Sequence, residues 1–154
     1  MCESTKLVLC CHLIYPRNIA SHRIEWKLRD NFKLGFNESA GGIAASGGTL
    51  SNLNALIAAR NCAGLESDSS AVFLTSEDAH SSFKKCARIM GLDKNNLIKI
   101  KTDNQGCMDL NNLLCTIDKC RRENKKIFSI VATLGTTIRG AIDPIYDISK
   151  ICKE

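Results

Sequence analysis

A glycine-rich turn at Gly47 and Gly48, followed by the hydroxyl of Thr49, stands directly before a segment with helical spacing. Glycine lets the backbone approach a ligand closely, and the first N–H groups of a helix point back at such a turn with the positive end of the dipole. These residues could therefore hold an anion such as a phosphate. On this stretch alone, a plain glycine-rich loop before a core helix stays open as the alternative.

Two familiar phosphate motifs fail at this turn. Residues 42–49 follow the P-loop spacing, but Gly48 stands where that motif needs the lysine that grips a β- or γ-phosphate. The Rossmann pattern G-x-G-x-x-G is also absent. The turn is therefore better suited to a small phosphorylated cofactor held by backbone amides than to a nucleoside triphosphate.

The turn must be positioned by the elements around it. A helix is predicted over 49–62, because Leu53, Leu56 and Ile57 recur at helical spacing among alanines. An amphipathic pattern predicts another helix over 18–34, and the apolar run within 1–15 indicates a buried strand or an ill-defined end. Further along, the pattern predicts strands at 71–75, 97–101 and 127–133, helices at 78–90 and 109–122, and a last helix opened by Asp143 as N-cap.

Strands that alternate with helices of this length predict an α/β fold with a mainly parallel sheet and right-handed crossovers. In such sheets ligands bind at the carboxyl ends of the strands. Residues 76–80 and 134–137 both follow predicted strands. We therefore expect these two loops and the glycine turn to converge on one site.

Composition limits the classes of function. A chain of 154 residues that is 44% hydrophobic and 24% charged is ordinary for one globular domain. The net charge of +5 is scattered, and the basic cluster at 121–126 lacks aromatic neighbours, so nucleic-acid binding is not expected. The amino-terminal apolar run is too short for a membrane span.

The nine cysteines include no C-x-x-C pair. This dispersal favours free thiols in a reducing compartment, and hence a cytoplasmic location, over a disulfide framework or a metal site.

Three stretches together carry a family resemblance. They are G-G-x-x-A-S-G-G-T-L-S-N-L-x-A-L-x-x-A-R at 41–60, S-E-D-A-H-S-S-x-K-K at 76–85 and V-A-T-L-G-T-T-x-R-G-A-I-D-P-I at 131–145. In this order the chain resembles the group II pyridoxal-phosphate-dependent amino-acid decarboxylases, the glutamate and aromatic-amino-acid decarboxylase family. The resemblance implies part of the large domain of the aspartate-aminotransferase-like fold, fold type I. Residues 17–154 would form the partial cofactor-binding domain, and 1–16 a divergent or truncated segment.

The resemblance also implies roles for single residues. Gly48 and Thr49 match positions that contact the phosphate of pyridoxal phosphate, and Gly47 shapes the turn. His80 matches the catalytic histidine that stacks on the pyridine ring and helps protonate the carbanion, although a lone histidine at a strand–helix junction is more often structural. Thr136 matches a threonine near the cofactor hydroxyl.

Three other family-like positions are expected to be structural. Asn52 would pack helices, Arg60 would pair with a nearby carboxylate, and Asp143 would cap the last helix.

The sequence stops at Glu154, before two residues that the family pattern places further on. These are the aspartate that pairs with the pyridine nitrogen and the lysine that forms the Schiff base. We therefore expect a fragment of a pyridoxal-phosphate-dependent carboxy-lyase that acts on an amino acid and forms a homodimer when complete. The alternatives are an aminotransferase or lyase of the same fold, or a non-catalytic remnant that binds a phosphate or a partner subunit.

Overall fold

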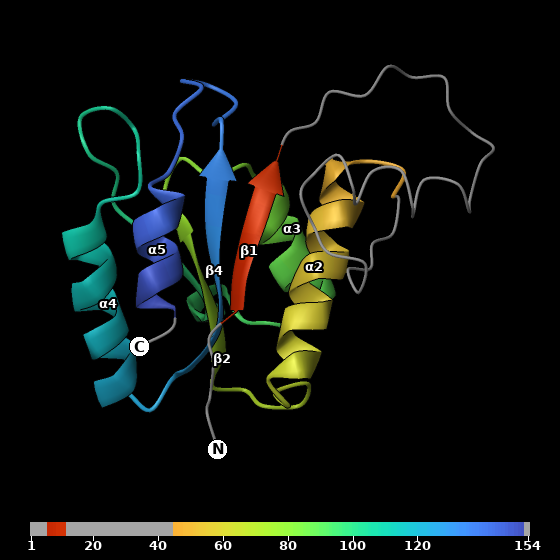
Figure 1. The fold of residues 1–154 in the computed structure, drawn as a ribbon. Helices are drawn as coiled ribbons and strands as arrows, with labels where there is room; N and C mark the ends of the chain where they lie inside the picture. The colour runs from red at the N-terminus through yellow and green to blue at the C-terminus, as the bar shows by residue number, and fades with distance from the viewer. Residues whose placement is uncertain (1–5, 12–44, 153–154) are drawn as a thin grey trace, which may run out of the picture.

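The computed structural model describes residues 6–11 and 45–152 (Figure 1). The helix expected over 18–34 lies outside the described residues. Within them, the elements in chain order are β1 (Lys6–Cys11), α2 (Gly48–Cys62), β2 (Ala71–Ser76), α3 (Ser82–Ile89), the short 3-10 helix η1 (Lys94–Asn96), β3 (Leu97–Ile100), α4 (Leu110–Arg122), β4 (Lys126–Leu134) and α5 (Ile145–Ile151).

The strands form one parallel sheet in the order β1-β4-β2-β3, which confirms the expected α/β class. The chain moves outward from β2 to β3 and then returns past β2 to β4. Because both crossovers are right-handed, this reversal requires α3 and α4 to lie on opposite faces of the sheet. Figure 1 shows this arrangement, with α2 and α3 on one face and α4 and α5 on the other.

Each face of the sheet has its own apolar core. On the α2/α3 side, Phe73 and Phe128 pack with ring centroids 5.6 Å apart, together with Leu56 of α2. On the α4/α5 side, the fully buried residues include Leu74 and Ile130. All six residues of β2 are buried, as expected for an interior strand of a parallel sheet that is covered on both faces.

Two helix starts differ from the sequence-based prediction. Helix α3 begins at Ser82 rather than Asp78, because the N–H of Glu77 donates to the Ile100 carbonyl at 2.8 Å and continues the strand geometry past β2. Asp143 is not the N-cap of α5. Pro144 occupies that position, and the Asp143 carboxylate instead accepts hydrogen bonds from the N–H groups of Met108 and of Thr133 in β4.

The prediction that Arg60 pairs with a carboxylate is also wrong. Within the described ranges, the guanidinium donates to the backbone carbonyls of Leu65, Met90 and Asp68 and not to a carboxylate. Asn52 does join helices as expected, since its amide donates to the hydroxyl of Ser82 in α3 at 3.1 Å.

Candidate functional site

Neighbouring strands β2 and β4 mark a topological switch point. After β2 the chain runs to α3 on one face of the sheet, and after β4 it runs to α5 on the other. Loops that part in this way leave a crevice at the carboxyl ends of the strands, where α/β sheets bind ligands. His80 lies in the loop that follows β2, and Thr136 in the loop that follows β4. Figure 1 shows that α2 begins at this same edge.

The amino-terminal end of α2 is open. The N–H groups of Leu50 and Ser51 donate to the Gly47 carbonyl at 3.1 and 3.0 Å, and those of Gly48 and Thr49 have no acceptor among the described residues. A Cβ added at Gly47 or Gly48 would meet nothing within 4 Å. The first turn of α2 also contains no acidic residue. An anion can therefore approach these N–H groups without a competing negative charge in that turn.

Glycine at position 47 is explained by space and not by backbone strain. Its φ of 161° is extended backbone that any residue can adopt. A side chain at this N-cap position could itself accept a hydrogen bond from the free N–H groups. Without one, Gly47 leaves these donors to a ligand.

His80 is half-buried in the turn between β2 and α3. Its Nδ1 accepts the N–H of Ser82 at 3.2 Å. A nitrogen that accepts a hydrogen bond carries no proton, so the neutral ring holds its proton on Nε2. The start of α3 therefore sets both the orientation and the tautomer of this ring.

Thr136 closes the loop that follows β4. The side chain is buried, its Oγ1 accepts the N–H of Ala141 at 3.1 Å, and its own N–H donates to the Ala141 carbonyl at 2.9 Å. Because the hydroxyl accepts in this contact, its proton remains available to donate. A loop held in this way presents the hydroxyl from a fixed position.

The three loops at the carboxyl edge are tied together. Arg139 Nε lies 3.7 Å from Asp78 Oδ2, which joins the His80 loop to the Thr136 loop. Glu77 Oε1 accepts the N–H and the hydroxyl of Thr102 at 2.9 and 3.0 Å, and these hydrogen bonds hold the pKa of Glu77 below its usual value. The loops after β2, β3 and β4 thus form one continuous rim.

Asp143 is the buried anchor of this rim. Its Oδ1 accepts the N–H of Met108 and its Oδ2 the N–H of Thr133, both at 2.7 Å, and the residue is only 2% exposed. Burial raises the pKa of this carboxyl, while the two backbone hydrogen bonds oppose the rise. The Asp-Pro pair in the sequence suggested a helix cap and contains no local signal for these distant partners.

Three buried hydroxyls have no hydrogen-bond partner within the described ranges. They belong to Ser76 at the end of β2, and to Ser129 and Thr133 in β4. None of them is a candidate site residue on the sequence alone. Strand alternation alone could have placed them on a face of the sheet but could not have shown that they lack partners.

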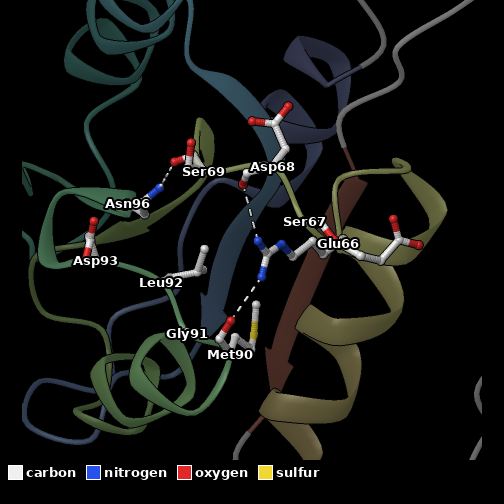
Figure 2. A pocket seen from close by; sticks show the side chains of 10 residues that line it. Glu66, Ser67, Asp68, Ser69, Met90, Gly91, Leu92, Asp93 and Asn96 are labelled. Carbon is white, nitrogen blue, oxygen red and sulfur yellow. Dashed lines mark hydrogen bonds between the residues drawn. The ribbon is translucent and has the colours of Figure 1, made fainter.

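A cavity of about 270 Å³ lies at the opposite, amino-terminal edge of the sheet. Arg60 lines it, and its guanidinium donates to the carbonyls of Asp68 and Met90, two residues that Figure 2 labels around the cavity. Asn96, which also lines the cavity, donates its amide to the carbonyls of Ser69 and Ala71, both at 2.8 Å. The Arg60 and Asn96 side chains thus hold loops in place. Of the residues singled out from the sequence, only Arg60 lines this cavity.

Residues 6–11 and 45–152 contain neither a membrane-spanning helix nor a group of side chains suited to a metal ion. None of the helices there combines the length and apolar character needed to span a bilayer. No three His, Cys, Asp or Glu side chains in these ranges are grouped so as to hold a metal ion.

Comparison with known proteins gives a consistent result. The family described as "Pyridoxal-dependent decarboxylase conserved domain" matches residues 22–154. An acidic amino acid decarboxylase from Xenopus tropicalis is 38% identical over 128 residues, and an aromatic-L-amino-acid decarboxylase from Bacillus atrophaeus is 34% identical over 122 residues. Each match covers 79% of this chain and 25% of the relative. The chain thus spans about a quarter of the length of these relatives.

Solved structures agree with the sequence matches. The apo structure of mouse CSAD superposes with a TM-score of 0.73 at 29% identity, covering 80% of this chain and 27% of the mouse chain. The structure of Catharanthus roseus tryptophan decarboxylase in complex with L-tryptophan gives a TM-score of 0.67 at 27% identity, covering 72% and 25%.

Proposed function

The chain belongs to the pyridoxal-dependent decarboxylase family, and from this we propose that the amino-terminal end of α2 holds the phosphate of pyridoxal phosphate. The observation that carries the proposal is the open helix start, where the N–H groups of Gly48 and Thr49 meet no acceptor among the described residues. A phosphate supplies the acceptor oxygens and negative charge that such a terminus favours. The neighbouring switch point is the kind of position at which α/β sheets bind ligands, so the rest of the cofactor would lie there.

The complete enzyme would remove the α-carboxylate of an amino acid as carbon dioxide and replace it with a proton on the α-carbon. When bound, pyridoxal phosphate supplies the electron sink for the pair left by the broken carbon–carbon bond. In this proposal Gly48 and Thr49 bind the phosphate, and the Thr136 hydroxyl orients the cofactor. The His80 ring would contact the cofactor ring and would carry a proton at Nε2, on the tautomer set by the Ser82 N–H.

The substrate would be an amino acid, as the names of the relatives indicate, and those names include both acidic and aromatic substrates. We further propose that the complete enzyme is a homodimer, which its mass in solution would test. A cytoplasmic location stays a prediction from the dispersed thiols, to be checked by fractionation of the source cells. The division of the chain at residue 16 also stays a prediction.

A change of charge at Gly48 tests the phosphate site. The space for a side chain is open there, so Gly48→Asp and the neutral, similarly shaped Gly48→Asn should both be accommodated. An aspartate stabilises a helix start by about 0.3–1 kcal/mol. The same charge would repel a phosphate a few ångströms away and weaken its binding by about tenfold or more. We expect Gly48→Asp to bind pyridoxal phosphate poorly while its unfolding temperature is unchanged or higher.

Equilibrium dialysis with pyridoxal phosphate, with inorganic phosphate as competitor, measures this effect. Gly48→Asn is the matched control and should keep most of the affinity. Wild-type affinity in Gly48→Asp would contradict the proposed site, as would binding that phosphate cannot compete away.

A further inference from the structure

The three partnerless hydroxyls differ in where the sheet puts them. Ser76 lies two residues after Leu74 in β2 and therefore points to the same face of the sheet, the α4/α5 side. Ser129 is paired in register with Phe73, so it lies on the α2/α3 side, in the first half of β4. Thr133 lies two residues after Val131, so it also points to the α2/α3 side, but at the carboxyl end of β4. Of these three, Thr133 alone combines the face of α2 with the edge where α2 begins.

The position of Thr133 is fixed by its backbone. Its N–H donates to Asp143 Oδ2 at 2.7 Å, and its carbonyl accepts the Asp143 N–H at 2.9 Å. The side chain is 2% exposed, and its hydroxyl meets no partner among the described residues. A buried hydroxyl without a partner costs about 1–3 kcal/mol, a penalty that valine, with the same shape, would avoid. The fold itself therefore gives no reason for a hydroxyl at this position.

We propose that the Thr133 hydroxyl is a further anion-binding group, which donates to the phosphate held at the start of α2, directly or through one bound water. The inference rests on the proposed function, because it adds a side chain from the central strand to a site otherwise made of backbone N–H groups. Bound phosphate would supply the acceptor that the hydroxyl lacks. The penalty carried by the ligand-free protein would then be relieved when the ligand binds.

Removal of the hydroxyl at constant shape tests the inference. In Thr133→Val we expect affinity for inorganic phosphate and for pyridoxal phosphate to fall about tenfold, the usual effect of losing one hydrogen bond to a charged group. The ligand-free variant should unfold at the same or a higher temperature than the wild type, since no hydrogen bond is lost. Thr133→Ser keeps the hydroxyl and should keep most of the affinity. A merely structural threonine would show the opposite pattern, with reduced stability and unchanged binding.

Ser129→Ala and Ser76→Ala are the matched controls, because each removes another partnerless hydroxyl from the same sheet. Both should bind phosphate like the wild type. If Thr133→Val does not fold, Thr133→Ala carries the test. Unchanged affinity in the folded Thr133 variant overturns the inference and leaves the α2 site standing, and equal losses in Ser129→Ala overturn it as well. If the wild type binds neither ligand, both the inference and the proposed function are wrong.

Discussion

The two edges of the sheet use polar groups in opposite ways. At the amino-terminal edge there is a cavity of about 270 Å³, yet its arginine and its asparagine are engaged by backbone carbonyls. At the carboxyl edge the N–H groups of Gly48 and Thr49 and the hydroxyl of Thr133 have no partner in the described part of the chain. The arginine and the asparagine of the cavity are thus used to hold loops, whereas the donors at the proposed anion site remain available to a ligand.

The physical basis of this contrast is the cost of an unpaired polar group. At the amino-terminal edge, Arg60 satisfies the carbonyls of three loop or helix-end residues, and its removal would leave them without that donor. At the carboxyl edge, the buried hydroxyl of Thr133 already carries this cost in the ligand-free chain, whereas the exposed N–H groups of Gly48 and Thr49 are open to water or to a ligand. Removal of the Arg60 side chain should therefore reduce stability, whereas removal of the Thr133 hydroxyl should reduce ligand affinity.

The largest effect should come from Arg60→Ala. Loss of three hydrogen bonds from a charged donor should lower the free energy of unfolding by about 3 kcal/mol, as measured by urea denaturation. Arg60→Lys keeps the charge but not the planar fork, so it should recover only part of the loss. Phosphate affinity of the folded fraction should not change. A selective loss of phosphate binding in either variant would break the comparison, because it would make the amino-terminal edge a ligand site.

A smaller loss of stability is expected for Asp143→Asn, which changes the buried residue that anchors the carboxyl-edge rim. An asparagine can offer one oxygen, so its amide group would face either the Met108 N–H or the Thr133 N–H, donor against donor. We expect a loss of about 2 kcal/mol in the free energy of unfolding. Phosphate affinity should also fall, because Thr133 would no longer be held. An unchanged affinity together with reduced stability would show that the anchor does not position the site.

The smallest effect should appear in the dependence of stability on pH. Acidification should weaken the contribution of the carboxylate at one edge and strengthen that of the carboxylate at the other. At the amino-terminal edge, hydrogen bonds from the Ser70 side chain, Lys126 and the Ser70 N–H lower the pKa of Asp68 from 3.8 to about 2. Its stabilising contribution is present above pH 3.8 and is lost as the pH falls toward about 2. Burial raises the pKa of Asp143, so its contribution is largest in acid and declines as the pH rises through that raised pKa.

Urea denaturation of the wild type, Asp68→Asn and Asp143→Asn at a series of acidic pH values measures how the free energy of unfolding depends on each carboxylate. Asp68→Asn should reduce the loss of stability on acidification, whereas Asp143→Asn should make that loss steeper. If both variants change the pH dependence of the free energy of unfolding in the same direction, the two carboxylates do not have opposite effects on stability in acid.

Much of the fold could be predicted from the sequence because its signals are local. The alternation of apolar runs with helical patterns indicated β2, β3 and β4 and the helices between them, and the crossover rule then required a parallel sheet. The glycine turn before α2 indicated an open helix start, which the structure contains. The three motifs indicated the family, which the match over residues 22–154 confirmed. The roles assigned to His80 and Thr136 stay predictions.

Which polar groups are paired depends on the tertiary structure. The sequence shows that an aspartate precedes a proline at 143, but not that its carboxylate reaches Met108, 35 residues away. It placed Arg60 on a helix, but not beside the carbonyl of Met90, 30 residues away. Thr133 was one β-strand residue among others until both faces of the sheet were covered and its hydroxyl was left without a partner. Periodicity is set by neighbours along the chain, whereas hydrogen-bond satisfaction depends on groups that meet only when distant segments pack.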